Sequence, residues 1–186
     1  MKIGIYIFML SCHLFCCAVN AQVADTLLWQ SDRSLHWMDY KGAPDYRSHF
    51  DALTHSEIKY KVSVHRALAR FDFVAFFMKK SSWTKHSQDP VLLKHEQIHF
   101  NIAELHKRLF IQILYTRNLY FDGFESEIKR LGDSINMARN KMDDKFDADV
   151  SNLRDVMKIN RWNREVTDAL DRLKVYNRNS ILVAIR

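Results

Sequence analysis

Two histidines and a glutamate stand close together in the middle of this sequence, in the run His95-Glu96-Gln97-Ile98-His99. If the run is helical, residues four positions apart lie on one face, about 6 Å from each other. Both imidazoles can then reach one small cation, and Glu96 stands beside the open coordination position, where it can take a proton from bound water. The spacing predicts one Zn²⁺ held by His95 and His99, with Glu96 as the catalytic base.

The residues around this run predict the helix that it needs. Asp89 can accept hydrogen bonds from the free N–H groups at a helix start, and Pro90 suits the first helical position. Apolar residues then recur mostly at steps of three and four, which predicts a helix from about Pro90 to Arg117 with one buried face. The alternative is a chance match formed by surface histidines in a histidine-rich chain.

The N-terminus predicts export from the cell. Lys2 gives a positive start, residues 3–19 are almost wholly apolar, and Val19-Asn20-Ala21 fits a signal-peptidase site. We expect a signal peptide over residues 1–21 and a periplasmic or secreted protein without stable membrane insertion after cleavage. A retained N-terminal anchor is the alternative, although the apolar run is short for a membrane span.

Length and composition favour one folded domain over residues 22–186 of the 186-residue chain. The apolar content of 47% is ordinary for a globular fold, and the low counts of Gly (4) and Pro (2) favour long helices over a β-sandwich. The basic residues behind the net charge of +6 are scattered, so we expect no nucleic-acid binding. All three cysteines precede residue 22, so the mature chain has no disulfide.

The order of the predicted elements indicates an α+β fold, because strands come first and helices follow. Residues 55–65 alternate between apolar and polar, and residues 68–78 are apolar on both faces, as expected of a half-buried and a fully buried strand. Apolar stripes predict two further helices, over about 124–146 and 156–173. Short strands or extended segments are predicted in 27–29, 35–40 and 181–183.

Several separated segments together resemble one known family. They are Leu35-His36-Trp37-Met38-Asp39-Tyr40-Lys41-Gly42-Ala43-Pro44, Ala52-Leu53-Thr54 followed by Ile58-Lys59-Tyr60, Ser82-Trp83, the stretch from Leu92 to Leu105, and Arg161-Trp162-Asn163. On these segments the chain resembles a bacterial family of secreted zinc-dependent proteases, a domain of unknown function in the zincin clan.

The resemblance implies a zincin-like arrangement, with a small, mostly antiparallel N-terminal sheet packed on the long motif helix and two further helices after it. It implies that one strand borders a cleft, and the strand from Phe73 to Met78 is the candidate substrate-side edge. A later helix would supply the third metal ligand. This chain has Asn152 where the family has a histidine, and Asp147 or Asp149 is the candidate to take that position. The alternative for both aspartates is a solvated acidic turn without a metal.

The function implied is a zinc-dependent peptidase that acts on peptide or protein substrates in the cell envelope or outside the cell. Because Asn152 replaces a family histidine, a catalytically impaired zincin-like pseudoenzyme, acting as a binding or structural module, is the alternative. A third candidate is a helical envelope protein whose motif is coincidental. Metal content separates this candidate from the peptidase and the pseudoenzyme, and turnover separates the peptidase from the pseudoenzyme.

Overall fold

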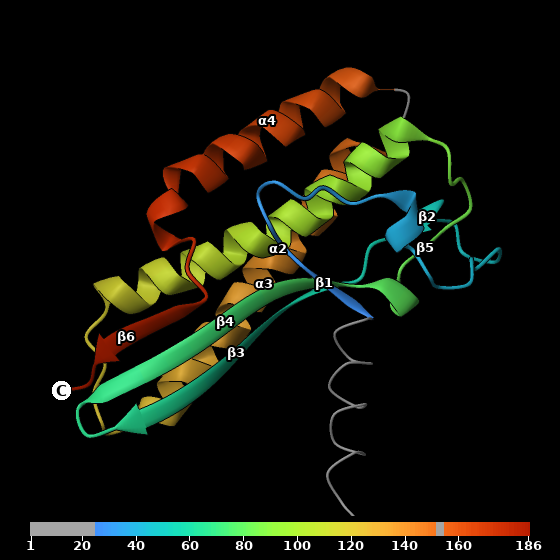
Figure 1. The fold of residues 1–186 in the computed structure, drawn as a ribbon. Helices are drawn as coiled ribbons and strands as arrows, with labels where there is room; N and C mark the ends of the chain where they lie inside the picture. Colours follow the sequence, from blue (N-terminus) through green and yellow to red (C-terminus); the bar gives the residue numbers. More distant parts are fainter. Residues whose placement is uncertain (1–24, 152–154) are drawn as a thin grey trace, which may run out of the picture.

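In the computed structural model, which describes residues 25–151 and 155–186, one long helix runs through the middle of the molecule (Figure 1). This helix, α2, spans Pro90–Thr116. It starts where the sequence predicts, because the Asp89 carboxylate accepts hydrogen bonds from the backbone N–H groups of Val91 and Leu92, at 2.8 and 3.0 Å. The main sheet lies on one side of α2 and the last helix, α4 (Val156–Arg172), on the opposite side. Both therefore pack on α2.

The main sheet has four antiparallel strands, and its central strand is β4, Leu68–Met78. Its neighbours are β3 (Ser56–His65) along one edge and, at the two ends of the other edge, β1 (Thr26–Leu28) and β6 (Ser180–Ala184). The long β3–β4 hairpin confirms the two strands predicted from the alternating and the apolar run. The expectation of an α+β fold with a small antiparallel sheet is confirmed.

A second, two-stranded sheet lies near the N-terminal end of α2. It consists of β2 (Ala52–Leu53) and β5 (Trp83–Thr84), which pair antiparallel. Residues 35–40, predicted as extended, instead contain the 3₁₀ helix η1, Trp37–Asp39. The chain turns there because the Asp39 carboxylate accepts a hydrogen bond from the His36 backbone N–H at 2.8 Å. Two more 3₁₀ helices are η2 (Lys79–Ser81) and η3 (Lys174–Tyr176).

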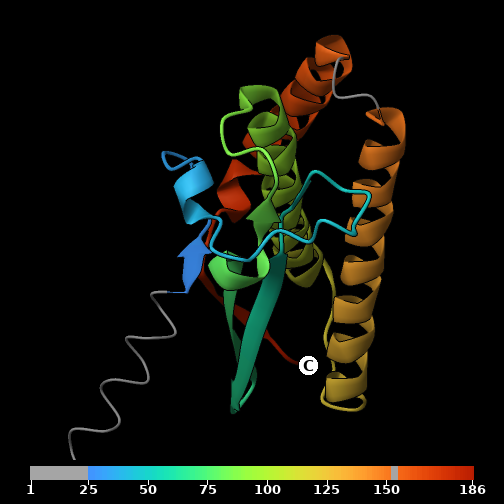
Figure 2. The same cartoon turned by 90° about the vertical axis from the view of Figure 1, so that its right-hand side faces the viewer.

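Helix α3, Phe124–Asp149, runs alongside the hairpin and α2 (Figure 2). The predicted apolar stripe holds over its first half, where Ile128, Leu131 and Ile135 pack into the core that α2 forms with the sheet. Gly132 permits this approach, since a Cβ there would lie 2.7 Å from the Tyr60 hydroxyl oxygen on β3. Packing against the sheet therefore fixes how α3 is turned about its own axis.

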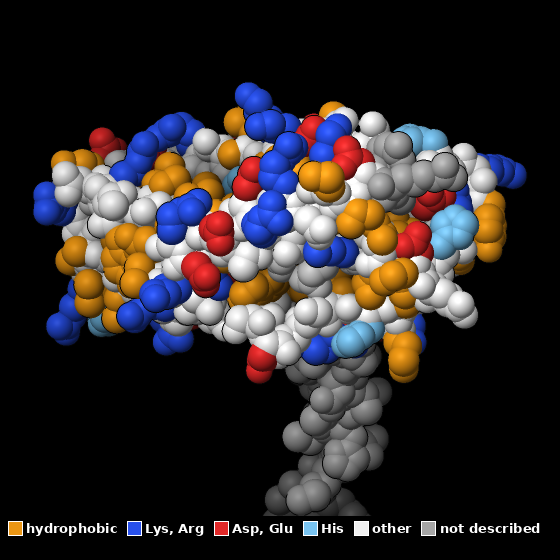
Figure 3. All heavy atoms as spheres, turned by 90° about the horizontal axis from the view of Figure 1, so that it is seen from above, with side chains coloured by type: hydrophobic (Ala, Val, Ile, Leu, Met, Phe, Trp, Pro, Cys, Tyr) orange, Lys and Arg blue, Asp and Glu red, His pale blue; other side chains and the backbone are white. Residues whose placement is uncertain are grey.

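Helix α4, Val156–Arg172, covers the opposite side of α2. Its apolar face is buried against α2 and the end of α3 through Ile159, Trp162, Val166 and Leu170. Lys and Arg side chains mixed with Asp and Glu spread over the face of the molecule that carries α4 in Figure 3. None of the helices in residues 25–151 and 155–186 combines the length and apolar content that a membrane crossing requires.

Candidate metal centre

His95 and His99 lie one turn apart on the face of α2 that is turned toward α3. Their Nε2 atoms are 3.1 Å apart, and both side chains are largely buried. The Phe146 ring of α3 stacks on the His95 ring, with centroids 4.4 Å apart, and meets the His99 ring edge-on at 5.0 Å. The apolar support of Phe146 thus fixes the two imidazoles beside each other, as the four-residue spacing predicts.

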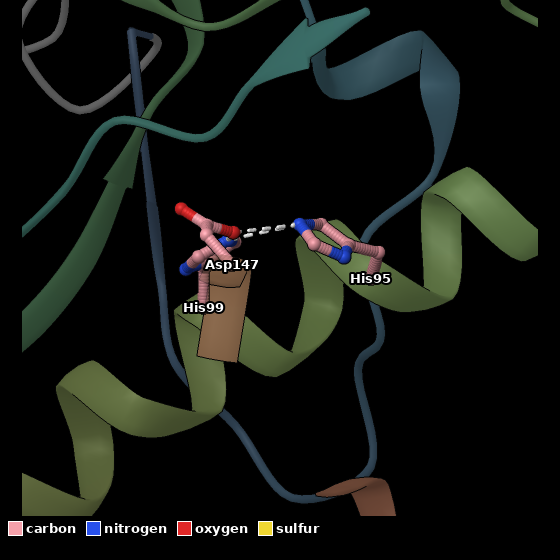
Figure 4. A group of neighbouring side chains, drawn as sticks. All are labelled: His95, His99 and Asp147. Carbon is pink, nitrogen blue, oxygen red and sulfur yellow. Dashed lines mark hydrogen bonds and ion pairs between the residues drawn. The ribbon is translucent and has the colours of Figure 1, made fainter. Parts of the chain in front are cut away.

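Asp147, on the last turn of α3, completes a group of three ligand atoms (Figure 4). Its Oδ1 atom lies 3.0 Å from Nε2 of His95 and 3.0 Å from Nε2 of His99. Neighbouring ligands on a tetrahedral zinc with bonds of 2.0–2.1 Å are about 3.3 Å apart. The three atoms therefore fit a zinc ion with a small outward adjustment, and two imidazoles with one carboxylate form a known type of catalytic donor set.

Asp149, the other carboxylate that the sequence left open, turns away from this group. Its Oδ2 atom accepts a hydrogen bond from the Trp162 indole N–H at 2.8 Å and pairs with the Arg161 guanidinium. Lys158 lies on its other oxygen at 3.6 Å. Asp149 therefore joins α3 to α4. Of the two aspartates, only Asp147 lies against the histidines.

Asp143 binds the outer nitrogen of His99. Its Oδ1 atom lies 2.8 Å from Nδ1 of His99, and its Oδ2 atom lies 3.4 Å from Nε of Arg139. Arg139 in turn donates a hydrogen bond to the hydroxyl of Ser56 on β3, at 2.9 Å. With Nδ1 of His99 donating to Asp143, Nε2 is the nitrogen that can bind a cation once the cation displaces its proton, and an outer carboxylate of this kind commonly supports metal-binding histidines.

The charges at this site favour a cation. Burial alone would lower the pKa of His99, but hydrogen bonds to Asp143 and Asp147, together with the charge of Glu96, raise it to about 10. Burial would raise the pKa of Asp147, yet the hydrogen bonds and charges of both imidazoles hold it well below its usual range. The carboxylates thus stabilise positive charge at the point where the three ligand atoms converge.

Glu96 is buried, with 4% of its surface exposed, and lines the same cavity as both histidines. None of the described residues donates a hydrogen bond to its carboxylate. The cavity has a volume of about 510 Å³ and lies between the loop that contains β2, the start of α2 and the end of α3. Glu96 can therefore hold a water molecule or accept its proton inside a space large enough for part of a peptide.

Two residues of this site were not predicted from the sequence, Asp143 and Arg139. They stand four and eight positions before Asp147, so all three share one face of α3. Ala138 and Met142, which belong to the apolar stripe that predicts this helix, precede Arg139 and Asp143 by one position each. Ala138 is exposed and Met142 only partly buried. The signal that would have found the pair is an Asp-x-x-x-Asp spacing that matches His-x-x-x-His on the facing helix.

The prediction that the strand from Phe73 to Met78 offers a free edge to a substrate is wrong. Both of its edges are occupied, because β3 pairs along one side while β1 and the backbone of Trp29 and Asn179 bond to the other. The strand that borders the cavity is β2, whose only strand partner in the described residues is β5. Asn152 and the predicted signal peptide over residues 1–21 lie outside the described residues.

Comparison of the chain with protein-family models, curated proteins and solved structures finds no match in any of the three. The resemblance to secreted zinc-dependent proteases thus stays a prediction from the sequence. The candidate site is defined by its own geometry, in which His95, His99 and Asp147 converge next to Glu96.

Proposed function

We propose that this protein is a zinc-dependent peptidase with a zincin-like arrangement of its site. The observation that carries the proposal is the convergence of His95 Nε2, His99 Nε2 and Asp147 Oδ1 in a cavity that Glu96 also lines. A zinc ion bound there would act as a Lewis acid on a peptide carbonyl and acidify a water molecule.

The residues of the chain would divide the remaining work. Glu96 would accept the proton of the attacking water and pass it to the leaving amine, because it lines the cavity and none of the described residues donates a hydrogen bond to its carboxylate. Asp143 holds His99 in the orientation that directs Nε2 at the cation. Phe146 excludes water from the other side of both rings. Each group is thus in place before a substrate enters.

The strand β2 offers a way to hold an extended peptide. Its partner β5 covers one edge, and the other edge is unpaired within the described part of the chain. Because Ala52, Leu53 and Thr54 line the cavity, a substrate strand added at this edge would pass close to Glu96. Main-chain hydrogen bonds of this kind bind peptides largely independently of sequence, which suits a peptidase.

Zinc content and turnover together test the proposal. Elemental analysis of the purified protein should give about one zinc per chain, and the protein should cleave a fluorescently labelled casein. The variant Glu96→Gln should keep its zinc and lose hydrolysis by a factor of about 10² to 10⁴. Glu165→Gln on the exposed side of α4 is the matched control and should cleave like wild type.

The outcomes separate the candidate functions. A protein without zinc affinity overturns the metal site. A protein that binds zinc and cleaves nothing is the pseudoenzyme alternative, a binding module that keeps the metal.

A further inference from the structure

One wall of the metal cavity is apolar. Phe50 and Leu53, in the loop and strand of β2, have 45% and 41% of their surface exposed, and both line the cavity. Leu92 from the first turns of α2 and Val150 from the end of α3 line the same cavity, and both are almost fully buried. We name these four side chains the apolar wall. Leu53 is held by the pairing of β2 with β5, and the Phe50 ring packs on the His49 ring with centroids 4.0 Å apart, yet both side chains keep a large exposed surface.

The polar groups of the same cavity are already engaged with one another. Asp143 binds His99 and Arg139, Arg139 also binds Ser56, and Asp147 contacts both imidazoles. In the proposed function, Glu96 binds the reacting water. A bound ligand therefore finds few free polar partners among the described lining residues, and its side chain gains most by covering the apolar wall.

The charges of the residues that line the cavity disfavour an acidic side chain of the ligand. Four carboxylates line the cavity, those of Asp51, Glu96, Asp143 and Asp147, while Arg139 is the single Lys or Arg in the described lining. Arg139 is held close to Asp143 and is thereby largely compensated. With a zinc ion bound, the four carboxylates outweigh the charges of Zn²⁺ and Arg139, so an acidic side chain on the apolar wall would lose its water in a lining of net negative charge.

We propose that the apolar wall is a specificity subsite that accepts one large apolar side chain of the peptide substrate, such as Leu, Met or Phe, and rejects Asp and Glu. This inference rests on the proposed function only in taking the ligand to be a peptide, since it concerns binding next to the metal centre and requires no bond to be broken. Leu53 and Phe50 determine the preference, because they are the members of the wall that a ligand can still cover.

Binding to a protein that does not cleave the ligand tests the subsite directly. The probe is a dansyl-labelled Gly/Ala octapeptide with one central variable residue, which is Leu, its isostere Asn, or Asp. Fluorescence anisotropy gives Kd for each peptide with zinc-loaded Glu96→Gln. The Leu peptide should bind about tenfold tighter than the Asn peptide or better. The Asp peptide should bind more weakly than the Asn peptide, because a carboxylate costs more than an amide to remove from water even where Glu96→Gln leaves the lining without net charge.

Substitutions in the wall should remove this preference. In the Glu96→Gln protein, Leu53→Asn and Phe50→Ser should each reduce the Leu-to-Asn affinity ratio at least about threefold without changing zinc content. Leu182→Asn is the matched control, because Leu182 is also an exposed leucine on a strand, with 59% of its surface accessible, but lies on β6 away from the cavity. That variant should retain the full ratio.

The failures of the two proposals are distinguishable. Equal affinity for the Leu and Asn peptides, or a ratio unaffected by Leu53→Asn and Phe50→Ser, overturns the subsite, even if the wild-type protein hydrolyses all three peptides. A clear preference for the Leu peptide in binding supports the subsite, even if wild type hydrolyses none of them, in which case the peptidase proposal alone fails.

Discussion

Asp147 and Asp149 stand two positions apart in the last turn of α3, and their carboxylates serve opposite sides of the helix. Two residues correspond to a rotation of about 200° about a helix axis. Asp147 therefore faces α2, with its Oδ1 atom 3.0 Å from Nε2 of both His95 and His99. Asp149 faces α4, where it binds Arg161 and the Trp162 indole.

This division predicts different losses from two similar substitutions. Asp147→Ala should release zinc, because it removes one of three ligands, whereas Asp149→Ala should retain zinc and lose some thermal stability. Zinc titration with a chromophoric chelator and a melting curve measure the two effects. Tight zinc binding by Asp147→Ala together with zinc loss in Asp149→Ala would reverse the assignment of the third ligand.

Asp143→Asn should weaken zinc binding without removing the site. The amide of Asn can still contact Nδ1 of His99, but it no longer carries the charge that makes the imidazole a better donor. Outer partners of this kind typically contribute a factor of about 10 to 100 in metal affinity. Competition against a chelator measures the zinc affinity of each variant. Asp144→Asn, one position along α3, is the control because Asp144 does not line the cavity. Equal affinity in both variants would show that Asp143 has no supporting role.

Glu104 should be important for stability, because it is fully buried between two buried cations of the same helix. Lys107 and Arg108 each lie 2.9 Å from its carboxylate, and the side chains of all three have at most 4% of their surface exposed. Glu104→Gln leaves these cations without their anion and should lower the free energy of unfolding by about 3–5 kcal/mol. Urea denaturation measures the change.

The control for Glu104 is the exposed pair formed by Lys129 and Asp133 on α3, at 2.6 Å. Asp133→Asn breaks an ion pair of the same kind in water, where it contributes little, so stability should barely change. A comparable loss in both variants would contradict the argument from burial.

His106 should make the stability depend on pH. Burial lowers its pKa, and the charge of Arg139 lowers it further. The hydrogen bond to the Ile102 carbonyl and the charge of Asp143 oppose this shift without cancelling it. Because the folded state binds the proton less readily than the unfolded state, folding stability should fall as pH drops below about 6.5, by at most about 1.4 kcal/mol per pH unit.

Replacing His106 isolates this contribution. The stability difference between wild type and His106→Leu at pH 8, where the histidine is neutral in both states, gives the packing cost alone. Below pH 6.5 the wild type should lose stability relative to the variant. A difference that stays constant from pH 8 to pH 5 would exclude His106 as the group responsible.

The sequence by itself determined the local features of this protein. The cap at Asp89, the four-residue spacing of His95 and His99 and the alternation in β3 act through contacts between residues close in the chain, so they are readable without a fold. For the same reason the start of α2 and the strand pattern of the hairpin agree with the prediction.

The tertiary structure decided which groups meet across elements. Whether Asp147 or Asp149 faces the histidines depends on the rotation of α3, which the packing of Ile128, Leu131 and Ile135 against the sheet and α2 fixes. The pairing of β1 with β4 closed the edge that the sequence favoured for a substrate, and β2 borders the cavity instead. These contacts join residues far apart in the chain, and their outcome is set by how whole elements pack, which local spacing does not encode.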